Sequence, residues 1–236
     1  MSFILGISCF FHDSSCALID ENGVVCAAEE ERFTRVKHDS SFPINAVRFC
    51  LDYKKITIEE IDKIIFYENP IIKFDRICKR FLKNLPKSIK ILPDIARQWH
   101  DEKLWFKEIC SNKLNIRKEK IFFFDHHLSH CYSALLPSGF KDAACLTIDG
   151  VGEWSTTNGY HFKNNKIEKI FTINFPHSLG LLYSAFTEFL GFEVNDGEYK
   201  VMGMAAYGKP NYLNEIEKLF LKRTKDNFEL DLNFFS

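Results

Sequence analysis

The sequence predicts an α/β fold in which a mixed sheet is flanked by helices. Short apolar runs separated by turn residues, at 3–9, 15–20 and 24–28, predict three consecutive strands that pair as a meander. From residue 44 onward, helical spacings alternate with further strand-like runs, which is typical of crossover connections in a sheet. With 236 residues, 46% of them hydrophobic, the chain can bury the core of one large domain or two small ones.

The first half of the chain supplies the predicted sheet. The Glu-Asn-Gly sequence at 21–23 predicts a tight turn between the second and third strands. Residues 44–53 carry Ile44, Val47 and Leu51 at helical spacing, which predicts a helix with one apolar face. Further along, we expect a buried strand at 61–67, a largely helical segment at 70–118 and another strand at 121–124.

In the second half of the chain, predicted helices again alternate with predicted strands. Asp125 is a suitable N-cap for a helix over 126–136, which the Pro-Ser-Gly sequence at 137–139 ends. We then expect strands at 143–149, 156–162 and 169–174, a helix at 179–190 and a strand at 228–232. A meander followed by crossovers is typical of the ribonuclease-H-like half of an actin-type phosphotransferase fold.

The composition narrows the function classes. A net charge of −1 gives no electrostatic reason to expect nucleic-acid binding. Residues 73–97 carry eight Lys or Arg against two Asp and form either a solvated helical face or a basic patch for RNA. Apolar residues alternate with these charges at roughly helical spacing, which favours the solvated face.

We also expect a cytoplasmic protein that does not enter a membrane. The N-terminus lacks the basic residues of a signal peptide, and no uncharged apolar run approaches the ~20 residues of a membrane span. The eight cysteines form no CxxC pair and mostly have apolar neighbours, which is typical of reduced thiols in a core.

A pair of histidines gives the strongest local signal. His126 and His130 are separated by one helical turn, so both imidazoles project from one helix face within reach of one metal ion. His127 is rotated away and contacts backbone or substrate instead. Two histidines do not complete a metal site, so either a carboxylate from elsewhere joins them or each has an ordinary protein partner.

The turn after the first strand and the segment after the third are both polar. In the turn, His12 is suited to act as a general base near neutral pH, and Ser14 and Ser15 are suited to hold anionic oxygen; alternatively, Asp13 closes an ordinary Asx turn. The segment at 29–39 either presents alternating charges to solvent or clamps phosphate through Arg32, Arg35 and Lys37.

Two glycine-containing segments complete the candidates. At 149–153, Asp149 lies at a strand end, where it can bind a cation or a hydroxyl, and its glycines allow close approach of a ligand; a plain hairpin explains the segment almost as well. At 195–208, three glycines with Glu198 and Lys200 indicate a loop that faces a ligand.

Taken in order, these five segments resemble a known family. The series GIxxFxHDSS, EERFTRVKHD, HHLSHxxSA, DGxGE and NDGEYKVMGxAxYG is similar to the carbamoyltransferases that include nodulation protein U and tobramycin carbamoyltransferase. The resemblance runs from Gly6 to the end of the chain, and the last motif is highly specific. Cys9, Cys16 and Ala206 depart from the pattern without removing a candidate chemical group.

The resemblance implies an actin-like domain with a ribonuclease-H-like core, related to the universal threonylcarbamoyl-tRNA modification protein. It also implies a YrdC-like domain that makes carbamoyl adenylate from ATP and carbamoyl phosphate. The actin-like domain then passes the carbamoyl group to a hydroxyl of a small molecule or saccharide. The implied cofactor is Fe2+ or another divalent metal.

The same resemblance implies roles for individual residues. His126 and His130 would hold the metal, while His12, next to Asp13, would take the proton of the acceptor hydroxyl. The adenylate would lie against Lys37, Arg35, Gly150 and Gly152, and the acceptor against Asp149, Glu198 and Lys200.

Members of this family are much longer chains. We therefore expect residues 1–236 to be the N-terminal part of the actin-like domain, with a helical insertion at about 70–118. We expect the remainder, including a third metal ligand and the YrdC-like domain, to act in cis or in trans, so that this chain alone is inactive. The alternatives are a non-catalytic binding or assembly module, a tRNA threonylcarbamoyl-transfer protein and, less favoured because of the paired histidines, an actin-like sugar kinase.

Overall fold

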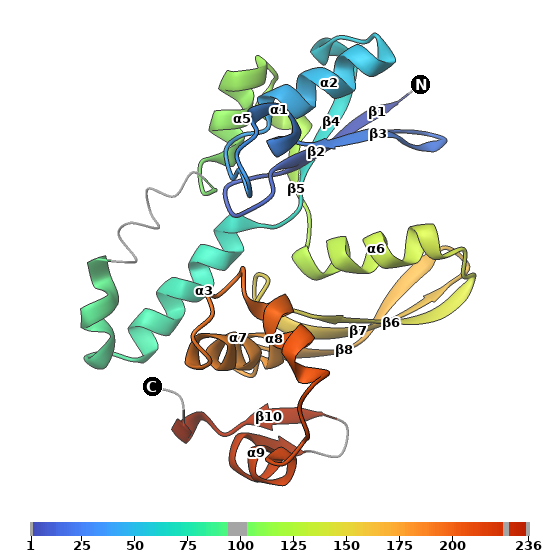
Figure 1. Cartoon of the computed structure of the whole chain (residues 1–236). Coiled ribbons are helices and arrows are strands. Elements are labelled where there is room, and N and C mark those ends of the chain that lie inside the picture. Colours follow the sequence, from blue (N-terminus) through green and yellow to red (C-terminus); the bar gives the residue numbers. More distant parts are fainter. Residues whose placement is uncertain (1, 94–102, 224–226, 235–236) are drawn as a thin grey trace. The chain divides into compact units, whose positions relative to one another are not determined.

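The computed structural model describes residues 2–93, 103–223 and 227–234 (Figure 1). The chain divides into two compact units, Met1–Ser129 and His130–Ser236. Each unit is described by itself below.

The first unit contains a mixed five-stranded sheet with the strand order β3-β2-β1-β4-β5 (Figure 1). Its antiparallel part is the predicted meander, in which Leu5 faces Leu18 and a Gly23 with φ of 122° closes the second turn. On the other side of β1, two strands run parallel to it and require crossovers. The strands are β1 (Phe3–Ser8), β2 (Ser15–Asp20), β3 (Gly23–Glu29), β4 (Ile61–Phe66) and β5 (Ile121–Phe123).

Two helices share a core with this sheet. Helix α2 (Ile44–Lys54) packs on β2 and β3 and contributes Ala46, Val47 and Cys50 to the core. Helix α5 (Phe106–Leu114) contributes its own buried face, in which the Phe106 ring stacks on that of Phe66 with centroids 4.1 Å apart. The other helices among the described residues of this unit are α1 (Glu31–Thr34), η1 (Ile58–Glu60), α3 (Pro70–Lys83), η2 (Lys87–Ile91) and η3 (Lys118–Lys120).

The second unit is built around a three-stranded antiparallel sheet, β6-β7-β8. Helix α6 (His126–Ser138) runs across the division of the chain, and the sheet strands β6 (Asp142–Ile148), β7 (Ser155–Lys163) and β8 (Lys166–Asn174) follow it. After the sheet come α7 (Leu179–Phe189), α8 (Glu198–Ala205), α9 (Leu213–Phe220), β9 (Leu221–Arg223), β10 (Phe228–Leu230) and η4 (Leu232–Phe234).

The predicted fold class is confirmed, because a mixed sheet of meander and crossovers is flanked by helices. Two local predictions were wrong. Helix α6 continues through Pro137 to Ser138, because a proline in the last turn removes only one hydrogen bond. The segment predicted as a loop at 195–208 contains helix α8, which starts directly after Gly197. The helical prediction for 70–118 is met by α3 and α5, while 94–102 lies outside the described residues.

The structure also bears on the predictions about the cysteines and about membrane-spanning segments. Six of the eight cysteines are buried, as expected for core thiols. Within residues 2–93, 103–223 and 227–234, no helix is both long enough and apolar enough to cross a bilayer.

The parallel strands place polar residues at one edge of the first sheet. Strands β1, β4 and β5 run in the same direction, so the residues after them emerge at the same edge. These residues are His12, Glu68 and His126, from three different parts of the sequence. The sheet direction therefore explains why the candidate groups of the first unit gather there.

A buried carboxylate anchors the segment that follows β3. Glu30 is 1% exposed, and its carboxylate accepts hydrogen bonds from the backbone N–H groups of Asn45 (3.1 Å) and Ala46 (2.9 Å). These N–H groups belong to the first turn of α2, where no helical carbonyl can reach them. A side chain from a distant segment thus caps the helix and matches the positive end of its dipole.

We predict that Glu30→Ala lowers the free energy of unfolding by about 1–3 kcal/mol, because it leaves buried donors without an acceptor. The measurement is chemical denaturation of the purified chain. Glu29→Ala is the matched control, since Glu29 makes only an exposed ion pair with Arg32, at 2.9 Å. Equal losses in the two variants would contradict the capping role.

Candidate functional site

The first turn and the segment after β3 are joined by backbone hydrogen bonds. The N–H of Phe10 donates to the carbonyl of Ser40 (2.7 Å), and the N–H of Ser14 donates to the carbonyl of Asp39 (2.8 Å). In return, the N–H of Glu30 donates to the carbonyl of Ser14 (2.8 Å). The two segments therefore form one polar surface.

Asp13 lies between two histidines on this surface. Its Oδ2 is 2.9 Å from Nδ1 of His12, and its Oδ1 is 2.8 Å from Nδ1 of His38. The hydrogen bond from His38, with a smaller contribution from His12, holds the pKa of Asp13 below its usual value, although partial burial opposes the shift. An ionised carboxylate accepts from both rings, which leaves Nε2 of His12 as the basic nitrogen.

Both segments contain residues with a left-handed backbone, as do several turns and helix ends elsewhere among the described residues. Phe10, Asp13, Arg35 and His38 all have positive φ values, between 48° and 67°. Such values are uncommon for residues other than glycine and persist only where the surroundings enforce them. They support a functional role for the surface on which His12 lies.

The predicted phosphate-binding residues have different surroundings. Arg35 and Lys37 are exposed on this surface, as an anion-binding role requires. Arg32 instead pairs with Glu29 and Glu31. The Ser14 hydroxyl is buried and has no hydrogen-bond partner among the described residues.

Sequence reasoning missed a buried ion pair at this edge of the sheet. Glu68 follows β4 and lies 2.7 Å from the ammonium of Lys103; both side chains are nearly fully buried. Burial raises the pKa of Glu68, but the ammonium groups of Lys73 and Lys103 outweigh burial and lower it. Lys103 also donates to the Tyr67 hydroxyl (2.9 Å) and lies 4.8 Å from the centre of the Phe11 ring. No spacing pattern in the sequence connects residues 35 positions apart.

Helix α6 carries the predicted histidine pair. Asp125 caps the helix, because its Oδ1 accepts from the N–H of Leu128 at 2.8 Å, as predicted. His126 and His130 are one turn apart on this helix, so their side chains share a face. His127, which the sequence set apart from the pair, is fully buried.

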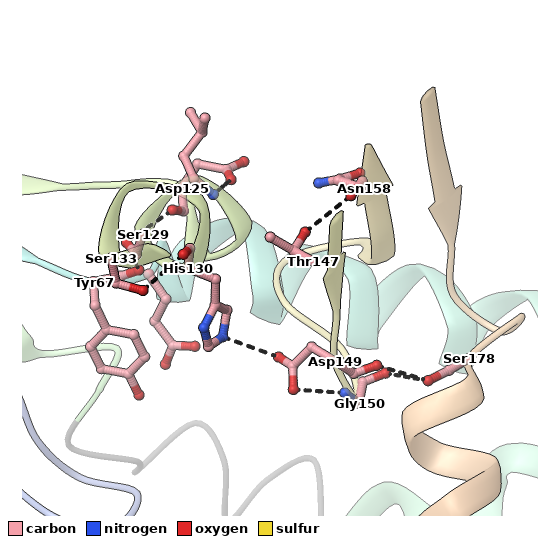
Figure 2. A network of polar contacts seen from close by, with 12 residues as sticks. Tyr67, Asp125, Ser129, His130, Ser133, Thr147, Asp149, Gly150, Asn158 and Ser178 are labelled. Carbon is pink, nitrogen blue, oxygen red and sulfur yellow. Dashed lines mark hydrogen bonds and ion pairs between the residues drawn. The ribbon is translucent and has the colours of Figure 1, made fainter. Parts of the chain in front are cut away.

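Asp149 lies beside His130 in the second unit. Its Oδ2 is 3.9 Å from Nε2 of His130, and Figure 2 shows the two side chains pointing toward each other. Its other oxygen accepts from the N–H of Gly150 (2.7 Å). The Ser178 hydroxyl donates to the carbonyl of Gly150 (2.6 Å), and this bond fixes the turn that presents the carboxylate (Figure 2).

The donor set of these residues fits a divalent metal. His126, His130 and Asp149 offer two imidazoles and one carboxylate, a combination typical of non-haem Fe(II). The separation of 3.9 Å between His130 and Asp149 is too long for a hydrogen bond. Two donors bound to one ion at about 2.0–2.2 Å lie about 3–4 Å apart, which agrees with this separation. The sequence left Asp149 as a ligand of either a cation or a hydroxyl, and the family resemblance placed it with the acceptor.

The predicted acceptor-binding residues of α8 have local partners. The Glu198 carboxylate accepts from Ser184 (2.9 Å) and from the N–H of Asn195 (3.1 Å). Burial raises the pKa of Glu198, but these hydrogen bonds outweigh burial and lower it. Lys200 pairs with Asp196 at 3.2 Å, four residues earlier. These contacts stabilise the start of α8, and binding of an acceptor by Glu198 and Lys200 remains a prediction.

We predict that Gly180→Ala destabilises the second unit. A Cβ at Gly180 would lie 2.5 Å from the carbonyl of Asp149, so the turn must shift, at a cost of about 1–3 kcal/mol. Gly203→Ala is the matched control, because it adds a Cβ to helix α8 in open space and should stabilise by about 0.5–1 kcal/mol. Thermal and chemical denaturation measure the change in the free energy of unfolding, which should fall in Gly180→Ala and rise in Gly203→Ala. Stabilisation by both substitutions would contradict the close packing at Gly180.

Comparisons with known proteins identify the family of the chain. The family described as "Carbamoyltransferase N-terminus" matches residues 3–235. The uncharacterized protein sll1178 of Synechocystis is 42% identical over 244 residues, which cover 100% of this chain and 40% of the relative. The nodulation protein NolNO of Sinorhizobium fredii is 32% identical over 208 residues, which cover 85% of this chain and 28% of the relative.

The chain therefore spans less than half the length of these two relatives. Among solved structures, YeaZ from Pseudomonas aeruginosa aligns with a TM-score of 0.40 and 14% identity, over 72% of this chain and 65% of that one. The family assignment rests on the sequence matches alone.

Proposed function

Because the chain belongs to the family of carbamoyltransferase N-terminal domains, we propose that it is part of an O-carbamoyltransferase. The proposed reaction moves a carbamoyl group, derived from carbamoyl phosphate through carbamoyl adenylate made with ATP, to a hydroxyl of a small molecule or saccharide. In the transfer step, the acceptor oxygen bonds to the carbamoyl carbon, the bond to the adenylate phosphate breaks, and AMP leaves.

The observation that carries this proposal is the contact between His12 and Asp13. The acceptor hydroxyl must lose its proton as it attacks, and a neutral imidazole is suited to take it near neutral pH. Asp13 accepts from Nδ1 of His12 at 2.9 Å, which leaves Nε2 with the lone pair that receives the proton. Lys37 and Arg35, on the same surface, are proposed to hold the adenylate phosphate.

We assign the metal to His126, His130 and Asp149, whose donors suit Fe2+ or another divalent ion. A cation held there would stabilise the negative charge that develops on the carbonyl oxygen. Gly150 and Gly152 lie in the turn after Asp149, where their lack of side chains would let the adenylate approach the backbone. The acceptor is proposed to contact Glu198 and Lys200.

We propose that activity also needs the sequence that extends beyond this region in the longer relatives, in cis or in trans. In the second unit, many large apolar side chains are exposed, and a partner that covers them would bury this surface. They include Leu146, Ile148, Ile170, Phe189, Met202, Met204 and Tyr207. A partner that covers them would supply the adenylate-forming part.

We predict that His126→Ala combined with His130→Ala abolishes binding of Fe2+ and other divalent ions, because one carboxylate alone holds them weakly. Metal content after anaerobic loading and dialysis measures the effect. The control is His161→Ala, since His161 is also an exposed histidine next to a carboxylate, Asp142, at 2.7 Å. Metal retained by the double variant would reject these ligands.

We predict that His12→Asn in the complete protein leaves adenylate formation intact but slows transfer about 10²–10⁴-fold, because the general base is lost. ATP–pyrophosphate exchange reports the first step. AMP release on addition of a panel of aminoglycosides and oligosaccharides reports the second. His161→Asn should change neither rate, and unchanged transfer in His12→Asn would exclude His12 as the base.

A further inference from the structure

We infer that His38 is a positioning residue for His12 and acts through the shared carboxylate of Asp13. The inference rests on the proposed function, in which His12 is the base. It goes further by assigning a role to His38, which the motif EERFTRVKHD contains but to which the family resemblance gives no role. It is carried by the geometry of one carboxylate held between two imidazoles.

The contacts determine which nitrogen of each ring bears its proton. Both oxygens of Asp13 face an Nδ1 atom, at 2.9 Å for His12 and 2.8 Å for His38. An ionised carboxylate has no proton to donate, so each neutral ring must carry its proton on Nδ1. His12 therefore presents an unprotonated Nε2, the form that a base requires.

Asp13 needs a second partner to hold this orientation. Its side chain is 41% exposed and that of His12 is 51% exposed, so a single contact between them would compete with water. The bond from His38 occupies the other oxygen and fixes the rotation of the carboxylate. Glu31 fixes His38 in turn, because its Oε2 accepts from the N–H of His38 at 3.2 Å.

The surroundings of the three residues add further constraints. Asp39 follows His38, accepts from the Thr34 hydroxyl at 2.7 Å and binds the Ser14 N–H through its carbonyl. Charged side chains also adjoin the rings: Glu31 lies close to Asp13 and His38, and Lys103 lies over the Phe11 ring that packs 4.5 Å from the His12 ring. Arg35 and Lys37 precede His38 on the same segment. Asp13 and His38 both have positive φ values, which are uncommon for residues other than glycine and persist where the surroundings enforce them.

The positive φ of His38 also provides a matched pair of variants. Asn and Gly both adopt this backbone conformation readily. Asn carries an N–H donor close to the position of Nδ1, whereas Gly has no side chain. His38→Asn thus keeps the donor to Asp13, and His38→Gly removes it. The backbone conformation at position 38 suits both residues.

The experiment is long-range ¹H–¹⁵N NMR of the histidine rings in the full 236-residue chain, which reports the protonated nitrogen of His12. We expect His12 to be protonated on Nδ1 in the native chain and in His38→Asn. In His38→Gly, we expect the ratio of the Nδ1–H to the Nε2–H tautomer to fall about two- to fivefold, as an exposed polar contact allows. Backbone spectra check that each variant is folded.

An unchanged tautomer ratio in His38→Gly would overturn the inference, as would a failure of His38→Asn to retain the native ratio. If His38→Gly does not fold, His38→Asp replaces it, since Asp has the shape of Asn but no donor, and the same loss is expected. The transfer assay on His12→Asn tests the proposed function separately. A tautomer shift together with transfer that does not depend on His12 would remove the catalytic meaning of the contact.

Discussion

The arrangement of the first unit depends on the buried residue Glu30. Its carboxylate caps helix α2, and its N–H binds the carbonyl of Ser14 in the first turn. Its own carbonyl accepts from the N–H groups of Phe33 and Thr34 and starts helix α1. A buried carboxylate is costly unless its oxygens are hydrogen-bonded, so this residue tolerates little movement of its partners. The segment with His38 and the turn with His12 are therefore both held by one residue.

In the second unit, close packing holds the candidate carboxylate in place. Asp149 lies at the end of β6, in a turn that Ser178 binds and against which Gly180 packs without a side chain. At this distance, any side chain at position 180 would force the turn to shift, so the packing leaves the turn a narrow range of positions. The carboxylate next to His130 is thus positioned by the start of α7, an element that contributes no candidate ligand of its own. His12 with Asp13 in the first unit and Asp149 in the second thus lie in turns that adjacent segments hold in place.

The sequence was sufficient to predict most helices and strands. It also predicted those functional groups whose positions depend only on residues close to them in the chain. Short apolar runs separated by turn residues predicted the meander, and Asp125 with the histidine spacing predicted α6, because these signals are local. The loop predicted at 195–208 was wrong because three glycines outweighed the helical preference of the residues between them. Glu68 with Lys103, and Asp13 with His38, could not be predicted, since their contacts arise only after the strands align. Asp149 was singled out, but its position beside His130 was not, for the same reason.

The two histidine sites differ in one chemical detail that separates their proposed roles. At His12 the carboxylate binds Nδ1, within hydrogen-bond distance, so the opposite nitrogen is available to take a proton. At His130 the carboxylate faces Nε2 at 3.9 Å, beyond hydrogen-bond distance and close to the separation of two donors that share one ion. The first arrangement suits a base and the second suits shared coordination of a cation. In the proposed transfer of an activated carbonyl group, the first would remove a proton from the nucleophile, and a cation held by the second would stabilise the oxygen on which charge develops.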